Sequence, residues 1–180
     1  MSDYVTDRSL LAGTVKRYSC WPVIREQTVG THCWGVYHIY WRIFGIPSAE
    51  IGFYIHQHDS EELVVGDNPY PSKFRFPALK AAVTEAESVA RRQLDLPSPY
   101  ELGLTEVDFA RGKICDLLEM MHWGMLEREM GNLLATPIVE RGGDAAQALA
   151  FDALPPQECR LVDQFVAKER QRHLRVLKTG

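Results

Sequence analysis

Imidazole and carboxylate side chains crowd into one short part of the chain, residues 56–62, which read His-Gln-His-Asp-Ser-Glu-Glu. Histidine nitrogens and carboxylate oxygens suit zinc, manganese, iron or cobalt, and they leave positions open for water and substrate. A loop rich in proline and glycine follows at residues 66–71. This density of ligand types next to a stiff loop predicts a metal-dependent site.

Residues far away in the sequence can complete such a site once the chain folds. His32 begins one expected helix, the pair His58-Asp59 ends another, and Asp116 lies inside a third. Four ligands delivered by three helices could therefore converge on one divalent ion.

The other acidic and histidine residues have simpler interpretations. Asp116 itself could be the ion-pair partner of Lys113, and Asp108 is the other acidic candidate on the same helix. His56 precedes His58 by two residues and so points elsewhere on a helix, which favours a structural or supporting role. The histidines that we interpret as non-catalytic are His38, His122 and His173.

The order His32, then His58-Asp59, then Asp116 resembles the H…HD…D signature of the HD-domain metal-dependent phosphohydrolases. Members of that family are all-α bundles, and many associate into homo-oligomers. The resemblance implies that these four side chains hold one divalent ion, which can be Zn, Co, Mn or Mg.

Longer stretches resemble the 5′-deoxynucleotidase branch of that family, which also holds phage dATP triphosphohydrolases. They are residues 17–18 (Arg-Tyr), residues 28–34 (Thr-Val-Gly-Thr-His-Cys-Trp) and residues 58–73. The resemblance runs from residue 17 to about residue 132. An ordered series of this length is far more specific than a lone His-Asp pair.

The resemblance also implies two catalytic carboxylates. Glu62 would orient or deprotonate the attacking water, and Asp67 would lie beside the scissile phosphate as an acid/base group or as a reader of the sugar. Glu62 follows His58 by four residues, which places it one turn further on if the helix continues. We expect Glu61 to face solvent, although a one-residue error in the helix phase would exchange it with Glu62.

Substrate-binding residues are implied in the same way. Arg17 offers a planar fork for phosphate and Lys73 a point charge, while Tyr18 would support the base or sugar. Cys20 follows into the presumed pocket. Pro71 belongs to the same set, because it stiffens the loop that carries Lys73.

These residues predict an enzyme that removes phosphate from deoxynucleotides. The short length and the unusual pocket residues favour a phage-type dATP triphosphohydrolase, which would release deoxyadenosine. A 5′-deoxynucleotidase acting on monophosphates is the alternative. A nucleotide-binding regulator with an inactive HD site, and a phosphodiesterase with a second metal ion, are the remaining hypotheses.

Composition restricts the classes of partner. The 180 residues carry 20 Lys+Arg against 24 Asp+Glu, a formal net charge of −4, and lack the excess of basic residues typical of proteins that bind nucleic-acid polymers. Apolar runs are too short for a membrane span, and the N-terminus does not resemble a secretory signal. The four widely spaced cysteines indicate reduced thiols. We expect a cytoplasmic protein, in the host cytoplasm if the chain is viral.

The apolar spacing predicts helices and little strand. We expect Ser48 to cap a short helix that reaches residue 56 or 58. Gly142-Gly143 and Pro155-Pro156 are interpreted as the bounds of a connector. The fold class is all-α, with one domain over residues 1–180 and a motif core at about 17–132. The longer helices are expected at residues 7–19, 31–44, 77–94, 104–130 and 158–177.

Overall fold

The computed structural model describes residues 11–68 and 75–179, with side chains described as far as residue 174. The described residues are all-α, as predicted, and apart from an isolated bridge between Lys16 and Thr28 they contain no strand. None of their helices is long and apolar enough to cross a membrane. In chain order the elements are η1 (Ala12–Thr14), α2 (Val29–Phe44), α3 (Ala49–Gln57), α4 (Glu62–Val65), α6 (Pro77–Gln93), α7 (Glu106–Glu129), η2 (Leu133–Ala135), α8 (Thr136–Ala153) and α9 (Pro156–Thr179).

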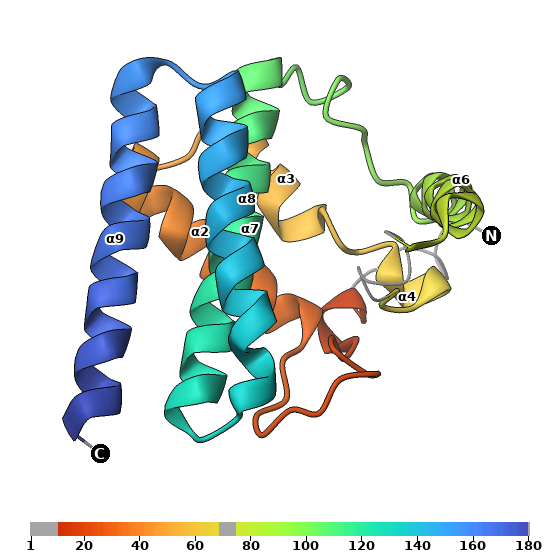
Figure 1. The fold of residues 1–180 in the computed structure, drawn as a ribbon. Coiled ribbons are helices and arrows are strands. Elements are labelled where there is room, and N and C mark those ends of the chain that lie inside the picture. Colours follow the sequence, from red (N-terminus) through yellow and green to blue (C-terminus); the bar gives the residue numbers. More distant parts are fainter. Residues whose placement is uncertain (1–10, 69–74, 180) are drawn as a thin grey trace.

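The core lies where α7 packs against α2, α3, α8 and α9 (Figure 1). Ile114, Leu118 and Met121 of α7 are fully buried there, together with Ile55 of α3. Helix α7 is therefore the central element of the molecule, and it is also the helix that carries Asp116.

Side-chain caps fix where the site-bearing helices begin. Thr28 and Thr31 form a capping box at the start of α2, so that His32 lies in its first turn. Ser48 accepts a hydrogen bond from the backbone N–H of Ile51 and caps α3, as predicted. Thr105 caps α7 in the same way.

The prediction of a connector between Gly142-Gly143 and Pro155-Pro156 is wrong, because both glycines lie inside α8. A Cβ on Gly142 would lie 2.9 Å from the carbonyl oxygen of Leu117, and one on Gly143 would lie 2.9 Å from the sulfur of Met121. The absence of side chains lets α8 approach α7 closely. Tertiary packing thus decides the role of two residues that usually interrupt helices.

The first expected helix, over residues 7–19, is also wrong in its described part. Only Ala12–Thr14 form a 3-10 turn, and residues 16–28 then form a loop that we call the strap. The backbone N–H of Arg17 donates to the carbonyl of Gln27 (2.9 Å), and that of Val29 donates to the carbonyl of Val15 (2.9 Å). The strap is therefore closed at its base.

Helix α6 stands away from the bundle formed by α2, α3, α7, α8 and α9 (Figure 1). It contacts mainly α4, and Arg91 ties it down by donating to the carboxylate of Glu61 (2.7 Å) and to the carbonyls of Gln57 and Pro97 (3.1 Å each). Its observed bounds, Pro77–Gln93, agree with the predicted helix at residues 77–94.

Candidate functional site

Three predicted metal ligands meet at one point of the structure. Nε2 of His32 lies 3.2 Å from Nε2 of His58 and 3.5 Å from Oδ2 of Asp59, and Nε2 of His58 lies 3.5 Å from the same oxygen. One ligand atom from each residue therefore lies within 4.8 Å of the other two. The fourth predicted ligand, Asp116, places Oδ1 3.1 Å from Nε2 of His32.

The second nitrogen of each ring fixes the orientation of both histidines. Nδ1 of His32 lies 2.6 Å from Oε2 of Glu119, and Nδ1 of His58 lies 2.7 Å from the carbonyl oxygen of Ile55. Both acceptors require the hydrogen on Nδ1, so each Nε2 carries a lone pair instead. The two Nε2 atoms face each other across the shared point. Two such lone pairs need a proton or a cation between them, and histidines held in this way are typical of metal sites. The donor set therefore fits a divalent ion.

Charges around the cluster decide which ring carries a proton when no metal ion is bound. Burial and Arg17 oppose a charge on His32, but hydrogen bonds to Asp116 and Glu119 overcome them and raise its pKa to about 9. Burial lowers the pKa of His58, so that this ring is neutral at neutral pH. In the metal-free protein a proton on His32 thus supplies the positive charge of the cluster.

Both aspartates are held in the ionised form. Burial alone would favour the neutral acid, but His58 and Arg17 keep the pKa of Asp59 below its usual range. Lys113 has the largest opposing effect at Asp116 and holds the pKa of that carboxyl well below its usual range. Asp116 contacts Lys113 through one oxygen and His32 through the other, so its two sequence-based interpretations are compatible.

The two residues left open by the sequence are engaged elsewhere. Asp108 completes the cap of α7 with Thr105 and pairs with Arg111 (3.0 Å). His56 is exposed, and its ring stacks on that of Tyr37 with 5.7 Å between the ring centroids. Neither side chain contacts the His32 cluster.

Glu62 lies near the cluster, but α3 does not continue as far as Glu62, contrary to the sequence-based expectation. Helix α3 ends at Gln57, and α4 begins anew at Glu62. The consecutive residues His58 and Asp59 follow the end of α3, and both side chains reach the cluster from this turn. Burial, followed by the charge of Asp59, raises the pKa of Glu62 to about 8. Its buried Oε2 has no hydrogen-bond partner among the described residues.

The expectation that Glu61 faces solvent is wrong. Its side chain is only 12% exposed and pairs with Arg91 of α6 at 2.7 Å. Glu61 therefore fastens α6, while its neighbour Glu62 faces the cluster.

Arg17 joins the strap to the cluster, since its Nη1 donates to Oδ2 of Asp59 at 3.1 Å. Tyr18 follows with a φ of 57°, a left-handed conformation that is uncommon for a residue with a side chain. Its backbone N–H donates to Oδ2 of Asp67 at 2.6 Å, and its ring stacks on Trp123 with 4.1 Å between centroids. Asp67 therefore holds the strap through Tyr18.

The remaining substrate-binding predictions have different outcomes. Cys20 is exposed on the strap and shares only a 3.8 Å contact with the hydroxyl of Ser19 among the described residues. Lys73 and Pro71 lie outside the described residues, so their roles stay predictions.

Sequence reasoning missed several side chains that hold the site together. Glu119 accepts hydrogen bonds from His32 and from Nε2 of Gln27 (2.7 Å), and Trp123 supports Tyr18. Both residues share the face of α7 that carries Asp116, at spacings of three and four residues. That spacing is the feature of the sequence that could have identified them.

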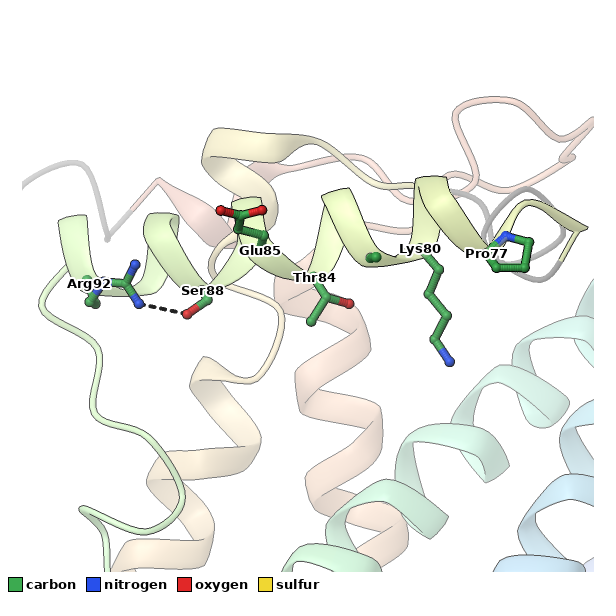
Figure 2. Close-up of a pocket in the computed structure, with 7 residues that line it drawn as sticks. Pro77, Lys80, Thr84, Glu85, Ser88 and Arg92 are labelled. Carbon is green, nitrogen blue, oxygen red and sulfur yellow. Dashed lines mark hydrogen bonds between the residues drawn. The ribbon is translucent and has the colours of Figure 1, made fainter.

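A shallow hollow on one flank of α6 is separate from this site (Figure 2). Its described lining comes from α6 alone, with a hydrogen bond of 2.8 Å from Arg92 to Ser88, and includes no predicted site residue. Since Glu85 is its only carboxylate and no histidine lines it, the hollow offers no comparable ligand set.

The arrangement of the helices corresponds to that of a known solved structure. The chain matches the cyanophage S-2L HD phosphohydrolase DatZ, solved in complex with dA and one catalytic Zn²⁺ ion. The TM-score is 0.70, at 17% sequence identity over 94% of this chain and 96% of that chain. No family model and no curated protein matches the sequence. The similarity confirms the predicted HD-type helical fold.

Proposed function

We propose that this protein is a divalent-metal-dependent phosphohydrolase that acts on deoxynucleotides. The observation that carries the proposal is the convergence of His32, His58 and Asp59 on one point, with both imidazoles oriented through Nδ1. An HD-type fold around that point adds support, because the similar phage protein is described with dA and a catalytic Zn²⁺.

His32, His58, Asp59 and Asp116 would hold the ion. When bound there, a divalent ion lowers the pKa of a coordinated water and neutralises charge on a phosphoryl oxygen. The protein contributes the orientation: Glu119 and the carbonyl of Ile55 fix the two rings before any ligand arrives.

Glu62 is the residue that we assign to proton transfer. Its carboxyl lies in a buried setting close to Asp59, and the raised pKa of about 8 makes its ionised form a stronger base toward water than an ordinary glutamate. The unpartnered Oε2 is available for that contact.

Arg17 would hold the phosphate. Its guanidinium uses Nη1 on Asp59, and its buried Nε has no hydrogen-bond partner among the described residues. A free donor beside a metal site suits a phosphate oxygen, since arginine binds such groups through two parallel hydrogen bonds. By resemblance, we assign Lys73 and Pro71 to the same substrate, and Tyr18 and Cys20 to its base or sugar. We assign Asp67 to the scissile phosphate as well as to holding the strap.

The specific reaction that we favour is dATP hydrolysis to deoxyadenosine and phosphates. It is supported by the dA in the similar phage structure and by the strap residues Tyr18 and Cys20. Hydrolysis of deoxynucleoside monophosphates is the second candidate, and Arg17 beside the cluster would serve it equally well.

Product analysis separates these reactions. Purified protein with Mn²⁺, Co²⁺, Zn²⁺ or Mg²⁺ is given each deoxynucleotide as mono-, di- and triphosphate, and the products are resolved by chromatography. Deoxyadenosine formed fastest from dATP supports the triphosphohydrolase, and turnover of monophosphates alone supports the nucleotidase. Stoichiometric binding without any turnover would contradict the enzyme and favour a regulator.

A further inference from the structure

The turn of the strap at residues 22–25 is held by a buried carboxylate far from the metal ligands in sequence. Glu127, near the end of α7, is fully buried, and its two oxygens accept hydrogen bonds from the backbone N–H groups of Ile24 (2.7 Å) and Arg25 (2.9 Å). No basic side chain in the described part of the chain lies within ion-pair distance of it. These hydrogen bonds therefore satisfy both oxygens of the buried carboxyl group.

Asn132 completes the arrangement. Its side-chain amide donates to Oε2 of Glu127 (2.8 Å) and to the carbonyl oxygen of Pro22 (2.9 Å). Three points of the strap, at Pro22, Ile24 and Arg25, are thus bonded to Glu127 near the end of α7 and to Asn132 just after it.

Glu127 also continues a stripe along α7. Asp116, Glu119, Trp123 and Glu127 are spaced by three, four and four residues, which places them on one face of the helix. The first two contact His32, and Trp123 supports the ring of Tyr18. The same helix face therefore positions the metal ligand, the first residues of the strap and its far turn.

We propose that Glu127, together with Asn132, is a positioning residue that sets where the strap presents Arg17 and Tyr18 to the deoxynucleotide. This inference rests on the proposed function. Arg17 and Tyr18 stand at one end of the strap, and Tyr18 has the uncommon φ of 57°. Such a conformation persists only where surrounding contacts maintain it, so release of the far turn would let both side chains move.

The experiment compares wild type with Glu127→Gln and with the control Glu140→Gln, an exposed position on α8. A glutamine presents one oxygen where the carboxylate presents two, so one strap N–H would face an NH₂ group. Two quantities are measured. The first is the rate of hydrogen exchange at the amides of Ile24 and Arg25 in the metal-free protein, which reports how tightly the strap is held. The second is KM and kcat with Co²⁺, determined for dATP or, where wild type prefers it, for dAMP.

We expect faster exchange at those amides and a KM raised about tenfold or more in Glu127→Gln, with kcat within about twofold of wild type. Glu140→Gln should match wild type in both measurements. Faster exchange with an unchanged KM overturns the inference, as does a loss confined to kcat.

Two further outcomes are decisive. Should Glu127→Gln fail to fold, Asn132→Ala replaces it. That change releases the Pro22 contact and the Asn132 hydrogen bond to Glu127, but it leaves both Glu127 oxygens on the strap backbone, and its KM must rise too. A wild-type protein that neither binds nor hydrolyses any deoxynucleotide overturns the proposed function and this role of the strap with it. Normal wild-type turnover with a normal KM in the variants overturns the positioning role alone.

Discussion

At the scale of single residues, the two adjacent glutamates at 61 and 62 illustrate how one position changes the chemistry. Glu61 pairs with Arg91, whereas Glu62 leaves a buried oxygen unpartnered near Asp59. Glu62→Gln should leave metal and nucleotide binding intact and lower kcat by about 10²- to 10⁴-fold, because the amide cannot accept the proton of water. The measurement is steady-state turnover together with calorimetric binding.

Glu61→Gln is the matched control. It should retain turnover, because Glu61 pairs with Arg91 of α6 and has no proposed contact with the substrate. Unchanged turnover in Glu62→Gln would move the proton-accepting role to Asp67. Equal losses in both variants would attribute the effect to disruption of the segment.

Glu119 gives a second prediction at this scale. Its carboxylate accepts from Nδ1 of His32, and that contact orients Nε2 toward the cluster. Glu119→Gln should weaken metal affinity about 10- to 100-fold, since a supporting partner of a ligating histidine is lost. Competition with a fluorescent chelator measures the affinity, and Glu140→Gln should show wild-type binding. An unchanged affinity would mean that His32 is not oriented through Glu119.

Much of the residue-scale site could be predicted from the sequence, and some could not. His32, His58, Asp59 and Asp116 followed from ligand type and order, and the structure places them in contact. Their roles as ligands stay predictions. Glu119 and Glu127 carry no local motif, because a carboxylate on a helix face is usually solvated until tertiary packing covers it.

At the scale of elements, the α7–α8 contact depends on glycine. Gly142→Ala would place a Cβ 2.9 Å from the carbonyl oxygen of Leu117 and 3.1 Å from the backbone nitrogen of Met121. Backbone atoms cannot yield as side chains do, so the helices must separate. The expected cost is about 1–3 kcal/mol of unfolding free energy, measured by chemical denaturation.

Gly52→Ala in α3 is the control with the opposite sign. There the new Cβ would meet Cε2 of Tyr37 at 3.7 Å, an ordinary contact. Alanine should therefore stabilise α3 by about 0.5–1 kcal/mol through helix propensity. A stabilising Gly142→Ala would contradict the close approach of α8 to α7.

Helix prediction failed where long-range contacts decide the outcome. The sequence predicted four helices closely. Amphipathic spacing indicated α2 and α9, a charged composition rich in Ala and Glu indicated α6, and a long apolar run indicated α7. The glycine pair in α8 was mistaken for a break, since only the partner helix shows why no side chain fits. The first residues of the strap, 16–19, were mistaken for the end of a helix, because side chains that hold the strap, such as Glu127, lie about a hundred residues away in the sequence.

At the scale of the whole molecule, metal binding should be coupled to protons. In the metal-free protein the pKa of His32 is about 9, and that proton must leave when an ion takes its place. The pKa values of His58, Asp59 and Asp116 are all lowered, so His32 is the one of these four groups that carries a proton at neutral pH. His32 therefore releases one proton per ion, and Glu62, whose pKa is about 8, can release up to one more when a cation binds beside it.

The sign and size of the effect follow from that proton. Because His32 is protonated below pH 9, affinity for the ion should rise by at least about tenfold per pH unit between pH 6 and 8. Calorimetry in buffers of different ionisation enthalpy measures the proton count. A pH-independent affinity, or binding that releases no proton, would contradict this assignment.

The most direct test of the central claim is the position of the ion itself. Crystals grown with Zn²⁺ and measured at the zinc absorption edge should show one anomalous peak bounded by Nε2 of His32, Nε2 of His58 and Oδ2 of Asp59, at about 2.0–2.2 Å from each. The Asp59→Asn variant should lose the peak. A strong peak elsewhere, with this cluster empty at saturating zinc, would contradict the metal site and the hydrolase built on it.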